Sequence, residues 1–233
     1  MRNKVIVLAF TVFFISLASV SAQEGPSTSV AGGGVLVKGW TGQIDAKEVT
    51  AGLTLNSAKL VKEGDGLRVT TGPAVTYWNP ANTAKGDYTV SATFHETKYM
   101  SINDHPHPYG IMIAGNDLGT EQQSYLYCAA YGDGRFIVRG FGPAPFQLGG
   151  RAPKADPSVN KAAGVGQPVT QEIAITVKGD AVSCSINKKV VASFAKSEVV
   201  VAGKLKSTDG TYGIRFAHNT DAAVTSFKKT KAL

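Results

Sequence analysis

Apolar and polar residues alternate in short segments along most of the chain, and glycine, asparagine or aspartate separates many of these segments. Alternation with a period of two is typical of β-strands, and no stretch keeps the 3.6-residue period of an amphipathic helix for three turns. The pattern predicts strands at residues 58–62, 67–70, 74–78, 88–95, 109–114, 124–131, 135–140, 173–178, 181–186, 189–194, 211–217 and 224–229. Strands at this spacing, with no helices between them, predict an all-β fold in which two antiparallel sheets form a jelly-roll sandwich.

The alternation also predicts which face of each strand is buried, because residues i and i+2 share a face. In segment 124–131, Leu126, Cys128 and Ala130 form a small, apolar face, whereas Tyr125 and Tyr127 lie on the opposite face. We therefore expect the first set in the core and the tyrosines outside, with their hydroxyl groups in water. The same reasoning places in the core Phe136, Val138, Cys184, Ile214 and Phe216.

If these strands share a sheet, its outer face presents Tyr125, Tyr127, Arg139 and Arg215, and His218 follows the last of them. Flat aromatic rings cover the apolar C–H faces of a sugar, and guanidinium groups donate hydrogen bonds to hydroxyl or carboxylate oxygens. These five residues are the predicted ligand-binding set. The alternative is an ordinary sheet face, on which tyrosine and arginine are good strand residues.

One long stretch, 141–168, has no regular pattern and contains five prolines. A loop of this length in a compact domain is often functional. We expect it to form the rim of any binding site.

The amino terminus has the three parts of a signal peptide: a positive start with Arg2 and Lys4, an apolar run from 5 to 18, and small residues before a cleavage site after Ala22. The alternative is a membrane anchor, but the apolar run is shorter than the ~20 residues that a spanning helix needs. We predict a signal peptide at 1–22, a flexible Gly/Ser/Thr-rich leader at 23–34 and one β-sandwich domain at 35–233. The mature protein would be secreted or periplasmic, with no membrane insertion after cleavage.

Charge and cysteine content restrict the class of partner. Loss of residues 1–22 lowers the formal net charge from +7 to +5, and the one dense basic run is 228–231 at the carboxyl terminus. Scattered charge of this kind does not predict a nucleic-acid partner. The two cysteines, Cys128 and Cys184, either form a disulfide, as exported proteins often do, or remain two buried thiols.

Candidate chemistry in the sequence is sparse. His105 and His107 lie two residues apart beside Asp104, and a third histidine, His218 or His95, could complete a zinc or copper site only if the fold brought it there. Prolines 106 and 108 explain the segment as a stiff loop, so we predict no metal and no cofactor. The sequence also lacks a Gly-x-Ser-x-Gly elbow, a phosphate-binding loop and a Cys-x-x-Cys pair.

Three segments carry a family resemblance: Gly86-Asp87-Tyr88-Thr89-Val90, the hairpin at 171–180 and the strand at 210–216. With the run of strands, they resemble the concanavalin A-like lectin/glucanase superfamily, closest to secreted bacterial laminin-G-like and 3-keto-disaccharide hydrolase-like domains. The resemblance implies two curved antiparallel sheets, a ligand on the concave face, and glycan binding or cleavage.

Two motifs of catalytic relatives are absent. The Glu-x-Asp-x-x-Glu of the laminarinase-type enzymes has one partial match, Glu63-Gly64-Asp65, and Arg68 stands where the second glutamate belongs. The Asn-Ser-Gly of the keto-disaccharide hydrolase-like domains does not follow strand 88–95, where Tyr109-Gly110-Ile111 stands instead.

We therefore predict an exported, glycan-associated domain that binds a saccharide without the catalytic residues of those enzymes. One alternative is a sugar-active hydrolase or lyase with Glu121 or Asp117 as base and His218 or His107 as its partner. The other is a structural or adhesive module of the cell envelope, which would have a flat outer face and no pocket near the tyrosines.

Overall fold

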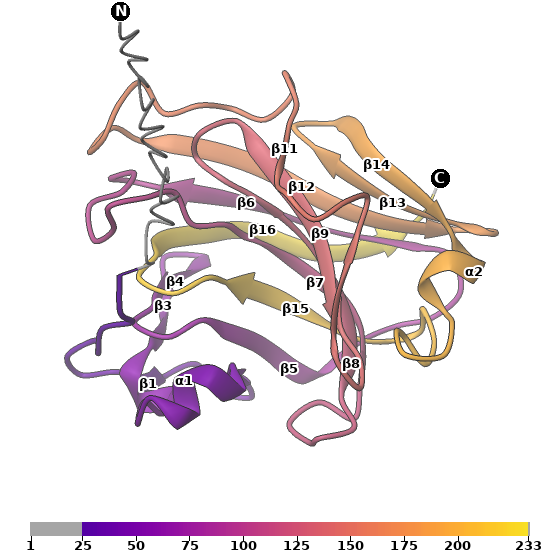
Figure 1. Cartoon of the computed structure of the whole chain (residues 1–233), viewed down its shortest axis with the longest axis horizontal. Helices are drawn as coiled ribbons and strands as arrows, with labels where there is room; N and C mark the ends of the chain where they lie inside the picture. The colour runs from indigo at the N-terminus through magenta and orange to yellow at the C-terminus, as the bar shows by residue number, and fades with distance from the viewer. Residues whose placement is uncertain (1–24, 233) are drawn as a thin grey trace, which may run out of the picture.

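The structure is a computed structural model that describes residues 25–232, in which two β-sheets pack face to face (Figure 1). Sheet A has the strand order β1 (Gly34–Val35), β3 (Lys59–Glu63), β4 (Gly66–Thr70), β16 (Asp221–Lys231), β6 (Tyr88–Glu96), β12 (Val169–Lys178), β13 (Ala181–Ile186) and β14 (Lys189–Ala195). Sheet B has the order β10 (Pro145–Leu148), β9 (Arg135–Phe141), β8 (Ser124–Ala130), β7 (Tyr109–Asn116), β15 (Gly210–Phe216), β5 (Val75–Ala84) and β2 (Thr41–Ile44), and β11 (Lys154–Ala155) also pairs with β9. Apart from the parallel β1–β3 pair, the described neighbours are antiparallel, as the predicted jelly-roll sandwich requires.

Every strand that alternation predicts is present, and the differences lie in lengths and in the short elements. β5 continues to Ala84 and β16 to Lys231, because pairing with a neighbouring strand extends beyond the apolar segment. The predicted irregular stretch 141–168 contains β10 and β11, which are too short to show an alternating pattern. Single turns of helix, also unpredicted, occur at α1 (Ala46–Thr50), η1 (Leu55–Ser57) and α2 (Lys196–Val199).

The face assignment in β8 is confirmed. Leu126, Cys128 and Ala130 belong to the large cluster of buried residues between the sheets, with the other residues predicted for the core. Tyr125 and Tyr127 belong to a separate apolar cluster on the other face of sheet B. Period-two alternation therefore places the tyrosines on the outer face, where the candidate site lies.

A disulfide joins Cys128 and Cys184, so the alternative of two free thiols does not apply. Cys128 lies in β8 of sheet B and Cys184 in β13 of sheet A, and their Cα atoms are 6.1 Å apart. The bond crosses the interior and links the two sheets.

The predicted signal peptide lies outside the described residues. Of the predicted flexible leader, the part from Gly25 onward lies against the domain. The backbone N–H and the hydroxyl of Thr28 donate to the side-chain oxygen of Asn219, at 2.9 and 2.7 Å. Val30 donates to the Ser57 carbonyl, and the segment then enters β1. The leader therefore contributes contacts that its composition did not predict.

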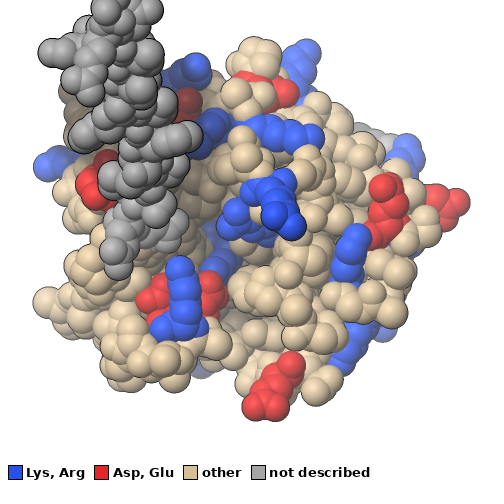
Figure 2. Space-filling model, viewed as in Figure 1, with Lys and Arg blue, Asp and Glu red and all other residues tan. Residues whose placement is uncertain are grey.

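On the face shown in Figure 2, lysine and arginine side chains are spread over several places, and acidic side chains lie among them. This mixture agrees with the scattered charge of the sequence. No helix in the described part of the chain is long and apolar enough to cross a membrane.

Candidate binding pocket on the outer face of sheet B

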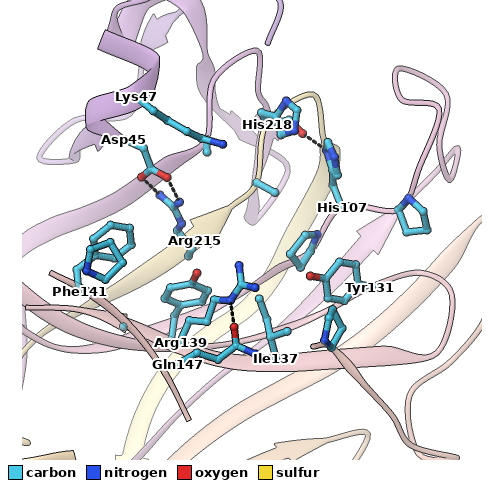
Figure 3. A pocket seen from close by; sticks show the side chains of 18 of the residues that line it. Asp45, Lys47, His107, Tyr131, Ile137, Arg139, Phe141, Gln147, Arg215 and His218 are labelled. Atoms are coloured by element: carbon cyan, nitrogen blue, oxygen red, sulfur yellow. Dashed lines mark hydrogen bonds and ion pairs between the residues drawn. The ribbon is translucent and has the colours of Figure 1, made fainter. Parts of the chain in front are cut away.

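A pocket of about 700 Å³ opens on the outer face of sheet B (Figure 3). Its floor comes from strands β8, β9 and β15. Its walls are the turn after β2 (residues 45–47), the loop before β7 (105–108), the end of β9 with the first three residues of β10 (141 and 145–147) and Pro153. The volume is typical of small-molecule sites, which run from about 300 to 1,000 Å³. The predicted rim, 141–168, lines the pocket with its first part.

The floor is aromatic and drier than the sequence predicted. Tyr125 and Tyr127 are only 3% and 6% exposed, because neighbouring aromatic and aliphatic side chains cover them. Phe141 packs on Tyr125 with ring centroids 5.0 Å apart, and the Tyr125 hydroxyl is hydrogen bonded to Thr76 at 3.0 Å. The expectation that the Tyr125 hydroxyl lies in water is therefore wrong. Tyr127 lines the pocket, whereas Tyr125 lies beneath it and is not among the lining residues.

Arg215, a predicted ligand-binding residue, lies on the floor but is engaged by another side chain. Its two terminal nitrogens donate to the two carboxylate oxygens of Asp45, at 2.7 and 2.6 Å, and one also donates to Thr76 at 3.2 Å. Burial alone would lower the pKa of Arg215, but the charge of Asp45, its hydrogen bonds to Arg215 and the nearby Tyr125 and Tyr127 together outweigh this effect and raise that pKa above its ordinary value. The guanidinium carbon also lies 5.6 Å from the ring centroid of Tyr127, and this cation–π contact stabilises the floor of the pocket.

Arg139 is the predicted guanidinium that remains directed into the cavity (Figure 3). Its Nε donates to the side-chain oxygen of Gln147 at 2.6 Å, which orients the planar group. Burial raises the pKa of Tyr127, and the charges of Arg215 and Arg139 partly offset this effect. The pocket thus presents an oriented cation beside a neutral phenol, a combination suited to the oxygens of a saccharide.

His218 is brought into contact with the two histidines of the loop before β7. The rings of His107 and His218 lie 4.0 Å apart between centroids, and the Nδ1 of His107 donates to the His218 carbonyl (Figure 3). The Nε2 atoms of His107 and His105 are 2.6 Å apart. All three histidines line the pocket. His95 does not join them, because it lies on β6 of sheet A, hydrogen bonded to Thr170.

The carboxylates of the hydrolase alternative lie elsewhere. Asp117 and Glu121 follow the end of β7, whereas His107 precedes its start, so the strand separates them from the histidines. Asp117 forms an ion pair with Lys206 instead. Among the described residues that line the pocket, Asp45 is the one carboxylate, and Arg215 engages both of its oxygens. The facing pair of carboxylates that glycoside hydrolysis requires is therefore not found among these residues.

Several lining residues were not predicted. Asp45 lies 170 residues from Arg215 and in a turn, so no local pattern points to its role. Tyr131 continues the alternation of Tyr125 and Tyr127 and could have been included on that basis. Phe146 reaches the pocket because β10 folds back on β9 across Gly140, where a Cβ atom would lie 2.2 Å from its ring.

Comparisons with known proteins identify the fold. No protein-family model matches the chain, and no match is found among curated proteins. Carbohydrate binding module CBM66 from Bacillus subtilis is a similar solved structure, with a TM-score of 0.55 and 10% identity over 85% of this chain and 99% of that one. A protein of unknown function with a galectin-like fold, also from Bacillus subtilis, has a TM-score of 0.56 and 14% identity, over 84% and 91%.

The carbohydrate recognition domain of Emp46p, in its metal-free form, has a TM-score of 0.51 and 10% identity over 84% of this chain and 89% of that one. At these identities the likeness concerns the fold alone. The chain shares the jelly-roll sandwich of the concanavalin A-like and galectin-like proteins, which is the fold that the sequence resemblance implied.

Proposed function

We propose that this protein is an exported carbohydrate-binding protein that holds a saccharide in the pocket on the outer face of sheet B. The observation that carries the proposal is the pairing of aromatic rings with an oriented guanidinium. Tyr127, Tyr131 and Phe141 line the cavity with aromatic rings, and Arg139 points into the same cavity. A flat outer face would have favoured a structural module, but this face is hollowed around Tyr127.

The charge of the lining supports a saccharide that carries a carboxylate. Among the lining residues that the structure describes, Lys47, Arg135, Arg139 and Arg215 are basic, and Asp45 is acidic. Asp45 pairs with Arg215, Asp133 pairs with Arg135, and Glu48 lies 4.0 Å from Lys47, so the basic surplus of the cavity rests on Arg139, for which the described residues provide no carboxylate partner. A field of one sign in a cleft raises the local concentration of ligands of the opposite sign.

Two further observations support the proposal. CBM66 and the Emp46p domain, whose names state carbohydrate binding or recognition, share the fold of this chain. Export is supported by the signal-peptide pattern at 1–22 and by the disulfide, since disulfides persist mainly in oxidising compartments.

A glycan array, followed by calorimetry on the best ligand, tests the proposal. We expect binding, with uronate-containing glycans above their neutral counterparts. Arg139→Met should weaken that binding roughly 10- to 100-fold, because a hydrogen bond to a charged group is worth about 1.5–3 kcal/mol. Lys62→Met is the matched control, since Lys62 is an exposed cation on β3 of sheet A.

The comparison of affinities is valid only if Arg139→Met has the same unfolding temperature as the wild type, which thermal unfolding followed by circular dichroism measures. An array without binders, or equal affinities for Arg139→Met and Lys62→Met, would contradict the proposal. Equal binding of neutral and acidic glycans would contradict the preference for a carboxylate while leaving saccharide binding in place.

A further inference from the structure

Three of the four histidines of the chain converge at one wall of the pocket. His105, His107 and His218 each offer one ring nitrogen, and these atoms lie within 4.8 Å of one another. His107 and His218 are buried, at 8% and 6% exposure, and 33% of the His105 side chain is exposed. The cluster is thus enclosed by protein on one side and open to the pocket on the other.

Backbone contacts around β15 hold the three rings in place. Ala217 donates to the Pro108 carbonyl at 2.9 Å, which ties the loop of His107 to the end of the strand. Asn219 adopts a left-handed backbone, with φ at 47°, a region that asparagine occupies more readily than most residues. Its side chain accepts from Thr28, and its carbonyl accepts from Asn103. The convergence is therefore built into the fold from three separate segments.

The hydrogen bonds of two of these rings determine where their lone pairs point. The Nδ1 of His107 must donate, because its partner is the carbonyl of His218. The Nδ1 of His105 likewise donates to the carboxylate of Asp104. In neutral imidazoles the two Nε2 atoms are then both acceptors, and they face each other at 2.6 Å. Two lone pairs at this distance repel unless a cation, either a proton or a metal ion, lies between them.

From this geometry we propose that His105, His107 and His218 bind one divalent transition-metal ion of the zinc or copper class. Imidazole nitrogens suit these metals, whereas calcium and magnesium prefer oxygen ligands. Metal-bound histidines almost always donate their other ring nitrogen to a carboxylate or a carbonyl, which is the arrangement of His105 with Asp104 and of His107 with the His218 carbonyl. With metal–nitrogen bonds of about 2.0–2.1 Å, tetrahedral ligand atoms lie about 3.3 Å apart. The two Nε2 atoms would separate slightly on binding.

Three protein ligands leave one tetrahedral position for another group, and the pocket is the open side of the cluster. A water molecule or an oxygen of a bound ligand would take that position. Metal binding does not depend on the proposed saccharide function, because the three histidines are in place without any ligand.

The test uses the chain from residue 23 to 233, produced with a tag that contains no histidine and stripped with a chelator. The protein is dialysed against zinc, copper or calcium in separate arms, and the metal per chain is measured by mass spectrometry in the absence of any saccharide. We expect one zinc and one copper ion per chain in the respective arms and no calcium. Asp104→Ala should weaken zinc binding about 10- to 100-fold, the usual effect of removing an outer hydrogen-bond partner.

His105→Asn and His107→Asn should abolish stoichiometric binding, and His105→Asn is the more informative because His105 is the most exposed of the three. His95→Asn, the fourth histidine, is the matched control and should bind as the wild type does. Absence of bound zinc and copper in the wild type would overturn the proposal and leave a shared proton between the rings. The proposal would also be overturned if His95→Asn lost as much bound metal as the other variants, or if His105→Asn still bound one metal ion per chain. Since no saccharide is present, none of these outcomes bears on the proposed carbohydrate function.

Discussion

Replacement of Asp45 by asparagine should destabilise the protein more than replacement of its partner Arg215 by methionine. The asymmetry follows from burial, since 7% of the Arg215 side chain is exposed and 17% of the Asp45 side chain. In Asp45→Asn the guanidinium keeps its charge on the floor of the pocket and loses an anion that accepts from both of its terminal nitrogens. Removal of one partner from a buried ion pair costs about 3–5 kcal/mol, because the other charge is left uncompensated.

In Arg215→Met the charge left behind is the Asp45 carboxylate, which water reaches at the wall of the pocket. The guanidinium carbon of Arg215 lies 5.6 and 5.5 Å from the ring centroids of Tyr127 and Phe141, and a flexible methionine side chain refills part of this space. We therefore expect a loss below about 2 kcal/mol for this variant.

Urea unfolding at neutral pH gives the free energy of unfolding of both variants. It is calculated from the midpoint urea concentration, provided that the dependence of the free energy on urea concentration has the same slope as in the wild type. The Asp45→Asn loss corresponds to a fall in Tm of roughly 6 to 20 °C for a domain of this size. Asp65→Asn, in the exposed turn between β3 and β4, is the matched control and should change stability by less than about 0.5 kcal/mol. A loss below about 1 kcal/mol for Asp45→Asn, or a larger loss for Arg215→Met, would show that water solvates the guanidinium and would refute the reasoning.

Three other perturbations probe separate parts of the molecule. Burial raises the pKa of Glu96 to about 7, so the folded state favours the protonated acid. The contribution of Glu96 to stability should be largest below about pH 4.5 and fall by up to about 3 kcal/mol as the pH rises to 7, and Glu96→Gln should remove this component of the pH dependence in urea unfolding at several pH values. The double variant Cys128→Ala/Cys184→Ala removes a disulfide between residues 56 positions apart, and its free energy of unfolding should be about 4 kcal/mol lower than that of the oxidised wild type. Unchanged stability would show that the disulfide does not constrain the unfolded chain. Gly140→Ala places a Cβ atom 2.2 Å from the Phe146 ring and 2.5 Å from the Tyr125 carbonyl oxygen, so it should displace Phe146, strain the β8–β9 pairing and lower stability by at least about 1–3 kcal/mol. Retained glycan affinity in calorimetry would show that the site does not depend on Phe146.

The floor of the site was predictable because strand geometry is local. A period of two decides which face Tyr127 occupies once β8 is recognised, and the same holds for Arg139 on β9. Alternation does not indicate how deeply a face is covered, so it placed the hydroxyl of Tyr125 in water although Thr76 and Phe141 enclose it. The difference arises from side chains on three strands that no single segment contains.

The walls could not be predicted, because they depend on contacts between residues that are distant in the sequence. His107 and His218 are 111 residues apart, and Asp45 and Arg215 are 170 apart. Each member of these pairs has an ordinary local explanation, such as a stiff proline-containing loop or a turn after a strand. Only the packing of the loop before β7 against the end of β15 makes the histidines into a cluster.

Because the strands form the floor and mostly loops form the walls, similarity of fold alone does not identify the ligand. Jelly-roll sandwiches with 10–14% identity to this chain have the same layers, but a fold hosts many functions, and specificity lies mostly in the loops that surround a site. Here the loops contribute the Asp45 carboxylate and all three histidines, and the short strand β10 contributes Gln147. The ligand of this pocket therefore has to be inferred from those groups. Their combination of a basic surplus with a three-imidazole cluster on one wall favours a ligand rich in anionic oxygen over a purely apolar one.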